Sequence, residues 1–407
     1  MSPRSPLSQI ARRTFRWEMS RAGAVGVLES FYWTFAVLVL LRHFESGPTS
    51  KALLLSAHSA GLLASLFIAP LRHRFGVSAP AFAAGISLAG AVGFFGAAFC
   101  LHSLWGFVLL SGFGLFCQTL QIPLHTRIYR ANYPEKERGR LFSLTLILRV
   151  AAMSAFAALA GQWLEADIRS IRWVLWLYGA CGLVNAACFL RIPRPIQPPA
   201  ARPPLFAALR HLKTDQRFRR LQVSWMFIGL GNLAGLAFFV EYLGSAQAGL
   251  GLSTAVVALL TGVLPQVVQV STSYGWGSLF DRLPFYQVRI AINTVFFLSI
   301  ALFYFSPWLL GVAAGIALHG AGRGGGGILW NLWATKLADE DKVMDFMSAH
   351  TFLAGLRALA APFLAFYLSA ATSPQVTAMV CLLLMLASSM VIWPDFLEER
   401  RGRPSAL

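Results

Sequence analysis

Charged residues are scarce in this chain of 407 residues, where Asp, Glu, Lys and Arg together make up 13%. A typical soluble domain has about 25% of such residues. So few charges cannot cover a water-facing surface of ordinary size, which excludes a soluble globular protein. Acidic residues are the scarcest of all, with 17 Asp and Glu against 34 Lys and Arg.

Residues that carry covalent or metal chemistry are also few. The five cysteines form no C-x-x-C pair, and each lies in or at the end of an apolar run, which favours packing over a metal or disulfide role. No H-x-x-x-x-D motif and no pair of histidines at metal-ligand spacing is found, which disfavours a membrane-embedded transferase. No phosphate-binding G-K-[ST] loop is found either, so an ATP-driven pump would need another subunit. We therefore expect no enzyme activity, no metal and no cofactor.

Long apolar runs are abundant instead. Each is about 20 residues long, which is enough for an α-helix to cross a hydrocarbon core of about 30 Å. The sequence therefore predicts an all-α integral membrane protein with twelve transmembrane helices. The predicted spans are 22–41, 51–71, 78–100, 104–126, 141–161, 172–190, 219–241, 252–273, 287–305, 308–333, 344–369 and 375–393.

Lys and Arg gather in every second gap between these runs. If the N-terminus is cytoplasmic, 27 of the 34 lie in cytoplasmic segments and 4 in external loops. Positive residues favour the cytoplasmic side, so we expect both termini there, in a multi-pass protein of a bacterial inner membrane. The net charge of +17 then reflects orientation and anionic lipid headgroups rather than nucleic-acid binding.

The chain divides into two halves of six predicted spans. We expect an N-terminal bundle at 1–191, a proline-rich cytoplasmic linker at 192–216, and a C-terminal bundle with a cytoplasmic tail at 217–407. Two such bundles around a cavity near the bilayer midplane are typical of secondary transporters.

One loop carries a recognisable motif. The segment after the eighth run reads YGWGSLFDRLPFYQVR and contains Gly277-x-Leu279-x-Asp281-Arg282. It resembles the G-x-L-x-D-R loop that major facilitator superfamily (MFS) transporters carry between their second and third helices and again between their eighth and ninth. At the first of these places the sequence APLRHRFGVSAP keeps Arg72 and Arg74 and lacks the acidic residue.

The resemblance implies an MFS-like fold of two six-helix bundles. It also implies that Gly277, Asp281 and Arg282, with Arg72 and Arg74, form a conformational latch rather than a substrate site. A carboxylate at a helix end can cap a neighbouring helix or pair with an arginine. The alternative is an ordinary charged turn.

Two features of the MFS drug/proton antiporters are missing. The fourth run, FVLLSGFGLFCQTLQIP, has no arginine for their R-x-x-x-G pattern. The fifth run has neither Gly nor Pro before Gly161. A multidrug antiporter is therefore disfavoured.

Ionisable residues inside the predicted spans are functional candidates, because each costs several kcal/mol in hydrocarbon unless it faces a cavity or a partner. His319 and Arg323 share a helix face with Trp330, and His350 shares one with Arg357. Three arginines against one clear acid predict a positive cavity, and arginine binds carboxylates and phosphates well. The alternative is that Arg149 pairs with Glu29 or caps backbone carbonyls, and that Arg357 bonds within the C-terminal bundle.

These residues give a set of candidate sites. Glu29 and His58 are candidates for proton coupling, since a buried carboxyl and a histidine can both titrate near neutral pH. The glycine-rich segment 319–336 allows either a local helix break that carries Arg323 into the cavity or close helix packing. The candidate substrate-binding residues are Arg149, Arg323, Arg357, His319, His350, Trp330, Asn232 and Gln266.

The sequence thus predicts a monomeric secondary active transporter that moves a small anionic organic solute by alternating access, with protons as candidate coupling ions. Its expected partners are the solute, the lipid bilayer and protons, and no nucleic acid. The alternatives are efflux of neutral or amphiphilic compounds and a transporter-like receptor or scaffold, because a fold does not fix function.

Overall fold

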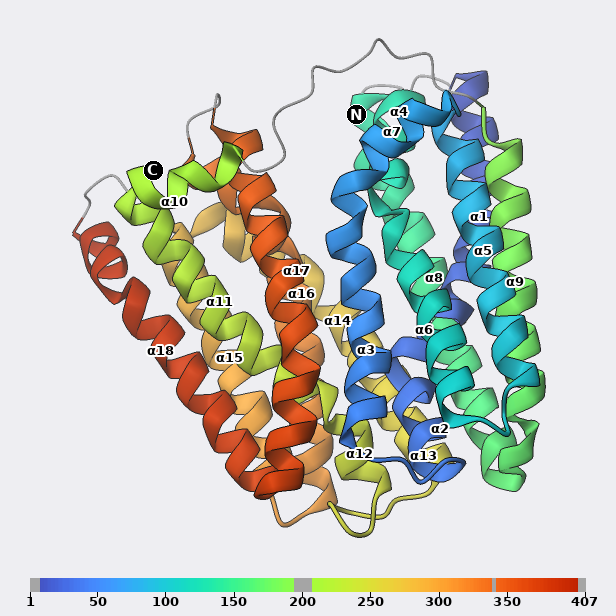
Figure 1. Cartoon of the computed structure of the whole chain (residues 1–407). Helices are drawn as coiled ribbons and strands as arrows, with labels where there is room; N and C mark the ends of the chain where they lie inside the picture. The colour runs from blue at the N-terminus through green and yellow to red at the C-terminus, as the bar shows by residue number, and fades with distance from the viewer. Residues whose placement is uncertain (1–7, 194–206, 339–341, 402–407) are drawn as a thin grey trace. The chain divides into compact units, whose positions relative to one another are not determined.

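The computed structural model describes residues 8–193, 207–338 and 342–401, and every regular element in these ranges is a helix (Figure 1). Helices satisfy their backbone hydrogen bonds within one segment, which is what a hydrocarbon environment requires. Most of the predicted linker 192–216 (residues 194–206) lies outside the described residues.

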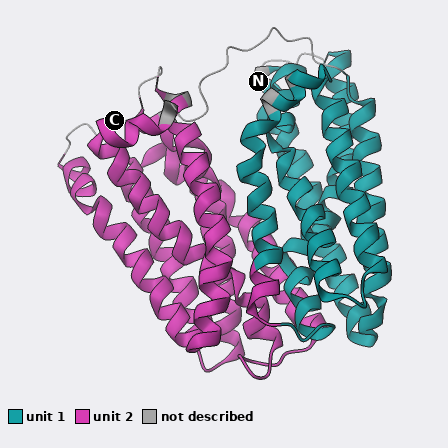
Figure 2. Cartoon of the chain, viewed as in Figure 1, with its two compact units in different colours: residues 1–46, 53–201 teal, residues 47–52, 202–407 magenta. Residues whose placement is uncertain are grey.

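The chain folds into two compact units (Figure 2). Unit 1 comprises residues 1–46 and 53–201, and unit 2 comprises residues 47–52 and 202–407. The first turn of α3, which begins at Pro48, is therefore grouped with unit 2.

Unit 1 is built from six long helical segments, some of them composed of two or three consecutive helices. Its helices are α1 (Gln9–Ser30), a π-helical turn (Phe31–Phe35), α2 (Ala36–Arg42), α3 (Pro48–Ala64), a 3-10 turn (Ser65–Phe67), α4 (Ile68–Phe75), α5 (Ala79–Phe99), α6 (Leu104–Leu120), α7 (Ile122–Asn132), α8 (Glu135–Ala166), a 3-10 turn (Ile168–Ser170) and α9 (Ile171–Arg191).

Unit 2 repeats this plan with six further segments. Its helices are a 3-10 turn (Ala207–Arg210), α10 (His211–Thr214), α11 (Gln216–Ala237), α12 (Phe239–Gly244), α13 (Thr254–Ala258), a π-helical turn (Leu259–Val263), α14 (Leu264–Arg282), α15 (Phe285–Phe305), α16 (Leu309–Leu337), α17 (Val343–Ala371) and α18 (Pro374–Arg400).

Eleven helical segments within the described residues are long and apolar enough to cross a membrane. The remaining long helix, α16, spans 29 residues, and His319, Arg323 and its glycines make it less apolar. The predicted all-helical membrane architecture of six plus six spans is confirmed.

Several helices extend well beyond the predicted apolar runs. The first begins at Gln9 rather than at residue 22, because the Ser8 hydroxyl accepts a hydrogen bond from the Ala11 amide and caps the helix. Thr14 and Glu18 then lie on its buried face. The sequence-based boundary placed these polar turns in water, whereas the structure packs them into unit 1.

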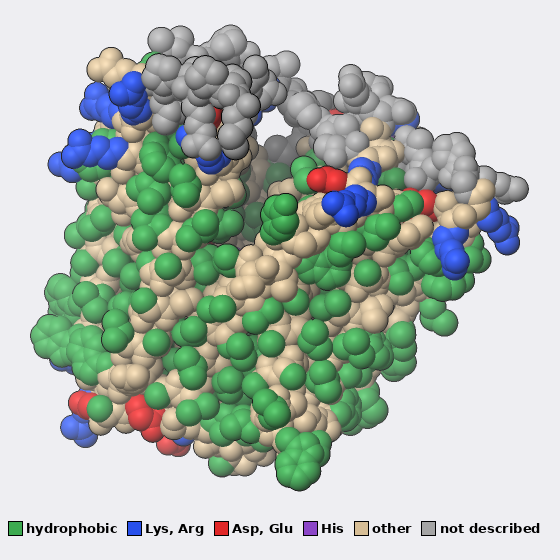
Figure 3. All heavy atoms as spheres, turned by 180° about the vertical axis from the view of Figure 1, so that it is seen from behind, with side chains coloured by type: hydrophobic (Ala, Val, Ile, Leu, Met, Phe, Trp, Pro, Cys, Tyr) green, Lys and Arg blue, Asp and Glu red, His purple; other side chains and the backbone are tan. Residues whose placement is uncertain are grey.

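Side chains follow the expected membrane pattern. On the face seen in Figure 3, hydrophobic side chains cover the middle of the helices, and the charged side chains gather toward the ends. Large apolar residues such as Leu159, Leu310 and Met390 are more than 60% exposed. Such a surface suits contact with lipid chains rather than with water.

Small residues bring the helices of each unit close together. In unit 1, α5 packs against α9, where a Cβ atom on Gly182 would lie 2.8 Å from the Cβ atom of Ala91. In unit 2, α16 runs without a break from Leu309 to Leu337, and a Cβ on Gly320 would overlap the carbonyl oxygen of Pro265 in α14. The glycine-rich segment therefore serves close packing, and no local helix break is present in α16.

Gly182→Ala should lower the stability of unit 1 by about 1–3 kcal/mol, the usual cost of overfilling a packed contact. The added methyl group meets Ala91, which has no flexible side chain that could yield. Thermal unfolding of the purified protein in detergent measures the effect. Gly85→Ala on α5 is the matched control, because its Cβ meets open space, and an equal loss in both variants would contradict the packing argument.

Candidate functional site

Glu29 and Arg149 contact each other within unit 1. Arg149 Nη1 of α8 lies 3.4 Å from Glu29 Oε1 of α1, and each side chain is about one-third exposed (34% and 30%). Gly26, one turn before Glu29, lies against the backbone of Arg149, where a Cβ would overlap the carbonyl oxygen. The structure thus favours the pairing alternative for Arg149 over a free cationic site.

His58, the second proton-coupling candidate, lies against an aromatic ring. Its imidazole stacks on Tyr32 with 4.1 Å between ring centroids and 19° between the planes. Tyr32 belongs to the π-helical turn Phe31–Phe35, and such turns are frequent at functional sites.

A second ion pair in unit 1 is fully buried, and the sequence analysis missed it. Arg21 Nη2 lies 2.7 Å from Glu18 Oε2, and the Tyr129 hydroxyl donates to the same oxygen at 2.6 Å. Arg21 Nη1 donates to Asn185 Oδ1 at 3.4 Å. Glu18 is therefore a second acid of unit 1 with an arginine partner, and both residues belong to the buried face of α1.

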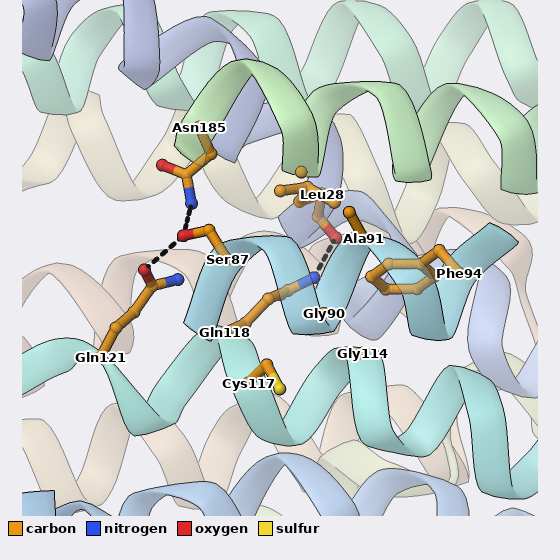
Figure 4. Close-up of a pocket in the computed structure, with 11 residues that line it drawn as sticks. Leu28, Ser87, Gly90, Ala91, Phe94, Gly114, Cys117, Gln118, Gln121 and Asn185 are labelled. Atoms are coloured by element: carbon orange, nitrogen blue, oxygen red, sulfur yellow. Dashed lines mark hydrogen bonds between the residues drawn. The ribbon is translucent and has the colours of Figure 1, made fainter. Parts of the chain in front are cut away.

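Asn185, which accepts from Arg21, also lines a small pocket between α1, α5, α6 and α9 (Figure 4). Asn185 Nδ2 donates to Ser87 Oγ at 2.9 Å, and Ser87 Oγ donates to Gln121 Oε1 at 2.9 Å. Gln118 Nε2 donates to the carbonyl oxygen of Leu28 at 3.4 Å. The polar side chains thus satisfy one another across the helices, which is the ordinary role of amides in a bundle.

Arg357 of α17 is buried in unit 2, where it is 5% exposed. Its Nη1 donates to the carbonyl oxygen of Trp225 at 2.7 Å, and its guanidinium lies over the rings of Trp330 and Trp225, with 5.2 and 5.8 Å to the ring centroids. Gly229 makes room for it, since a Cβ there would overlap Arg357 Nε.

A second arginine, Arg289, shares this location. It is 2% exposed, and its guanidinium carbon lies 3.5 Å from the ring centroid of Trp225. Arg289 stands at the start of the predicted span 287–305 and is one of the 27 Lys and Arg residues counted as cytoplasmic, so it was not among the candidate site residues. The signal was present, because Phe285, Val288, Arg289, Ile292 and Phe296 follow one buried helical stripe.

His350 completes this cluster. Its Nδ1 donates to Gln222 Oε1 at 3.0 Å, and its ring centroid lies 4.3 Å from that of Trp330 and 4.9 Å from that of Trp225. The ring centroid of Trp333 lies 5.4 Å away. We name this group the Trp225 cluster. Its members are Gln222, Trp225, Arg289, Trp330, Trp333, His350 and Arg357.

The Trp225 cluster holds many hydrogen-bond donors for which the described residues supply no acceptor. Buried polar nitrogens are normally paired, so a concentration of unpaired donors is unusual. These nitrogens are Arg289 Nε and Nη2, Arg357 Nε, Gln222 Nε2, Trp225 Nε1 and Trp333 Nε1. Each of them could donate to an oxygen of a bound anion.

The other candidates of unit 2 lie apart from this cluster. His319 Nε2 donates to Asn232 Oδ1 at 3.1 Å, and the rings of Phe239 and Phe296 flank it. Gln266 is buried, and its Nε2 has no hydrogen-bond partner. Arg323 is half-buried one turn after His319 in α16. Trp330, seven residues after Arg323 in the same unbroken helix, lies beside His350 of α17.

The predicted latch residues lie at helix ends. Gly277 is in the last turns of α14, and Asp281 and Arg282 are exposed at its end. Lys336 of α16 donates to the carbonyl oxygens of Phe280 and Leu283 and so caps α14. In unit 1, Arg72 Nη1 donates to the carbonyl oxygen of Val77 at 3.0 Å, and Arg74 is exposed. Partial burial and the nearby Arg127 lower the pKa of Arg72.

The buried cations of the described residues differ in how their charge is balanced. Arg21 pairs with Glu18, Lys51 with Glu241 at 2.8 Å, and the half-buried Arg220 with Asp395 at 2.6 Å. Within the same described ranges, Arg289 and Arg357 have no carboxylate partner. The described part of the chain also holds no group of three His, Cys, Asp or Glu residues that could bind a metal ion.

Comparisons with known proteins agree with the fold. A family model described as Major Facilitator Superfamily matches residues 22–362. No curated protein matches the chain. Among solved structures, a variant of the nucleoside transporter NupG has 13% identity and a TM-score of 0.79, with 93% of this chain and 99% of that one covered.

Two further structures are similar. A bacterial homolog of the human lysosomal transporter Spinster has 14% identity and a TM-score of 0.67, with 97% of this chain and 98% of that one covered. A D-xylose-proton symporter has 12% identity and a TM-score of 0.62, with 94% and 95% covered. At these identities, the similarity establishes the fold alone.

Glu18→Gln should destabilise the protein by about 3 kcal/mol, because it leaves Arg21 buried without its counterion. Thermal unfolding in detergent measures this loss. Glu137→Gln is the matched control, since Glu137 and Arg140 have the same i,i+3 spacing and are partly exposed, so their pair should contribute less than about 1 kcal/mol. Equal effects in the two variants would contradict the buried pair.

Arg289→Gln should have the opposite effect and raise the unfolding temperature of the ligand-free protein. It removes a buried charge that has no carboxylate partner among the described residues, and such a charge costs stability. Arg219→Gln, an exposed arginine of α11, is the control for the loss of one positive charge. A marked loss of stability in Arg289→Gln would show that the cation–π contact with Trp225 is structural.

Proposed function

Because the chain belongs to the Major Facilitator Superfamily, we propose that it is a secondary active transporter that moves a small anionic organic solute by alternating access. Members of this family are transporters and not enzymes, so the proposal concerns the solute, its binding residues and the coupling. The observation that carries it is the pair of buried guanidiniums in unit 2, Arg289 and Arg357, which have no carboxylate partner among the described residues.

Charge balance supports an anionic solute. A buried charge is tolerated when it is paired or when it serves a solute or ion pathway. Arginine also presents a rigid fork that matches the two oxygens of a carboxylate or phosphate. An anion in the Trp225 cluster would neutralise the guanidiniums and accept hydrogen bonds from the unpaired donors.

We assign the predicted residues accordingly. Arg357, His350 and Trp330 bind the solute, joined by Arg289. His319, Asn232, Gln266 and Arg323 line the neighbouring part of unit 2.

In unit 1, Arg149 serves Glu29 rather than the solute. Protonation of Glu29 would release Arg149, which makes this pair the candidate for proton coupling, with His58 beside it.

The remaining assignments concern the path of the chain through the membrane. We propose a monomer in a bacterial inner membrane with both termini in the cytoplasm, as the distribution of Lys and Arg predicts. The exposed Asp281 and Arg282, with Gly277, Arg72 and Arg74, would then form cytoplasmic latch contacts that change between conformations.

Thermal unfolding of the purified protein with a panel of solutes tests the proposal. Ligands that bind the folded form raise the unfolding temperature, so carboxylates or phosphorylated compounds should raise it, and sugars, cations and neutral amphiphiles should not. The selected anion should then enter proteoliposomes that contain the wild type. A rise confined to cations or neutral amphiphiles would favour the efflux alternative and make the arginines structural.

Arg357→Gln should reduce uptake of that anion at least about tenfold, the expected effect of losing one charge-assisted contact. Arg219→Gln removes an exposed positive charge from α11 and should transport like the wild type. Circular dichroism and gel filtration establish that both variants are folded. Uptake by Arg357→Gln at the wild-type rate would contradict a solute-binding role for Arg357.

A further inference from the structure

We infer that the Trp225 cluster is built for a dianion, an organic solute with two negative charges such as a dicarboxylate or a phosphate monoester. This inference rests on the proposed function and makes it specific. It starts from Arg289, which the motifs and the family resemblance do not assign to any role.

The buried charges of the described residues do not balance. With histidines left aside, the buried acidic and basic side chains in the described ranges are Glu18, Arg21, Lys51, Asp395, Arg289 and Arg357. The first four form ion pairs with Glu, Asp, Lys or Arg, whereas Arg289 and Arg357 form none that the described residues supply. Two uncompensated positive charges therefore remain within one unit.

These two guanidiniums lie close together. Both are placed against the same indole, with 3.5 and 5.8 Å to the ring centroid of Trp225. Like charges so close in a poorly screened interior repel each other. A monoanion would leave one positive charge uncompensated, whereas a dianion neutralises both.

The unpaired hydrogen-bond donors of the Trp225 cluster are of the kind that the oxygens of a dianion accept. The two guanidiniums lie over the faces of aromatic rings, and no carboxylate of the described residues pairs with them. Arg289 leaves Nε and Nη2 without acceptors, and Arg357 leaves Nε. The indole nitrogens of Trp225 and Trp333 and the amide nitrogen of Gln222 add three more donors. Two carboxylates, or the oxygens of one phosphate monoester, supply the acceptors that such a set needs.

Arg289 is thereby a specificity-determining residue. Arg357 also bonds to the carbonyl of Trp225 and is seated beside Gly229, so it has a fixed position with or without a solute. The contact described for Arg289 is a cation–π interaction with the indole ring of Trp225. The preference for a second negative charge should therefore follow Arg289.

Binding to the purified full-length protein tests this inference with probes that differ in charge. Succinate and monomethyl succinate are close in shape and carry two and one negative charges at pH 8. Phenyl phosphate carries two charges on one phosphate and separates a dicarboxylate site from a phosphate monoester site. The wild type should bind succinate or phenyl phosphate at least about tenfold more tightly than monomethyl succinate, the effect of one further charge-assisted contact.

The variants separate a specificity role from a structural one. In Arg289→Gln, the ratio of dianion to monoanion affinity should fall to about one, and in Arg289→Lys, which keeps the charge, the ratio should stay above one at lower affinity. Arg219→Gln should keep the wild-type ratio. A purely structural role of Arg289 would lower both affinities together and leave their ratio unchanged.

The outcomes also separate this inference from the proposed function. If the wild type binds monomethyl succinate as tightly as succinate and phenyl phosphate, or if Arg289→Gln keeps the preference for dianions, the dianion inference is wrong and an anion transporter remains. If no anion of the larger panel binds and Arg357→Gln has no effect on transport, both proposals fail.

Discussion

A hydrocarbon solvent offers neither hydrogen bonds nor counterions, and this constraint governs the structure at every level. The backbone N–H and C=O groups form their hydrogen bonds within helices, and every regular element of the described residues is a helix. Glycines such as Gly182 let the helices approach closely enough to pack without a strong hydrophobic drive between them. Charged side chains face the same requirement, and each must find its counterion inside the protein or in something the protein binds.

The two units meet that requirement differently. In unit 1, two arginines of the bundle form ion pairs with glutamates. Arg21 pairs with Glu18, and Arg149 lies beside Glu29. In unit 2 the corresponding negative charge is missing around Trp225 among the described residues, where aromatic rings hold Arg289 and Arg357 instead. Aromatic faces attract a cation less strongly than a carboxylate does, so they hold it without competing with an incoming anion. Among the described residues, Arg21 and Arg149 of unit 1 thus have carboxylate partners and Arg289 and Arg357 of unit 2 have none, which is the basis of the proposed anion site.

Much of the fold could be predicted from the sequence, because hydrophobic runs of membrane length and alternating positive gaps reflect physical requirements of the bilayer. The site could be predicted only in part. His350, Arg357 and Trp330 were chosen because they are polar or aromatic within apolar runs, and they lie together. Arg21 stands just before the predicted span 22–41, and Arg289 stands in the first turn of the span 287–305 and was counted as cytoplasmic. Both belong to the buried stripe of a helix that continues past these positions.

The pairing of Arg149 with Glu29 could be stated from the sequence only as an alternative, for a different reason. Arg149 and Glu29 are far apart in sequence, and only the packing of α1 against α8 brings them together. Helical spacing likewise places Trp330 and Arg323 on one face of α16, and only the tertiary structure shows that the Trp330 ring lies beside His350 of the next helix. Helical periodicity identifies the residues that share one face of a helix, but it does not identify the helix that packs against that face.

Because Gly229 of α11 lies against Arg357 of α17, the residues that can be accommodated at these two positions depend on each other. Arg357 can occupy its place only while position 229 has no side chain. In a chain where residue 357 were short, a larger residue at 229 would fill the vacated space rather than displace a guanidinium. The two positions should therefore be epistatic. In the evolution of such proteins, a glycine at the first would be retained for as long as an arginine stands at the second, and the loss of that arginine would free both positions to drift.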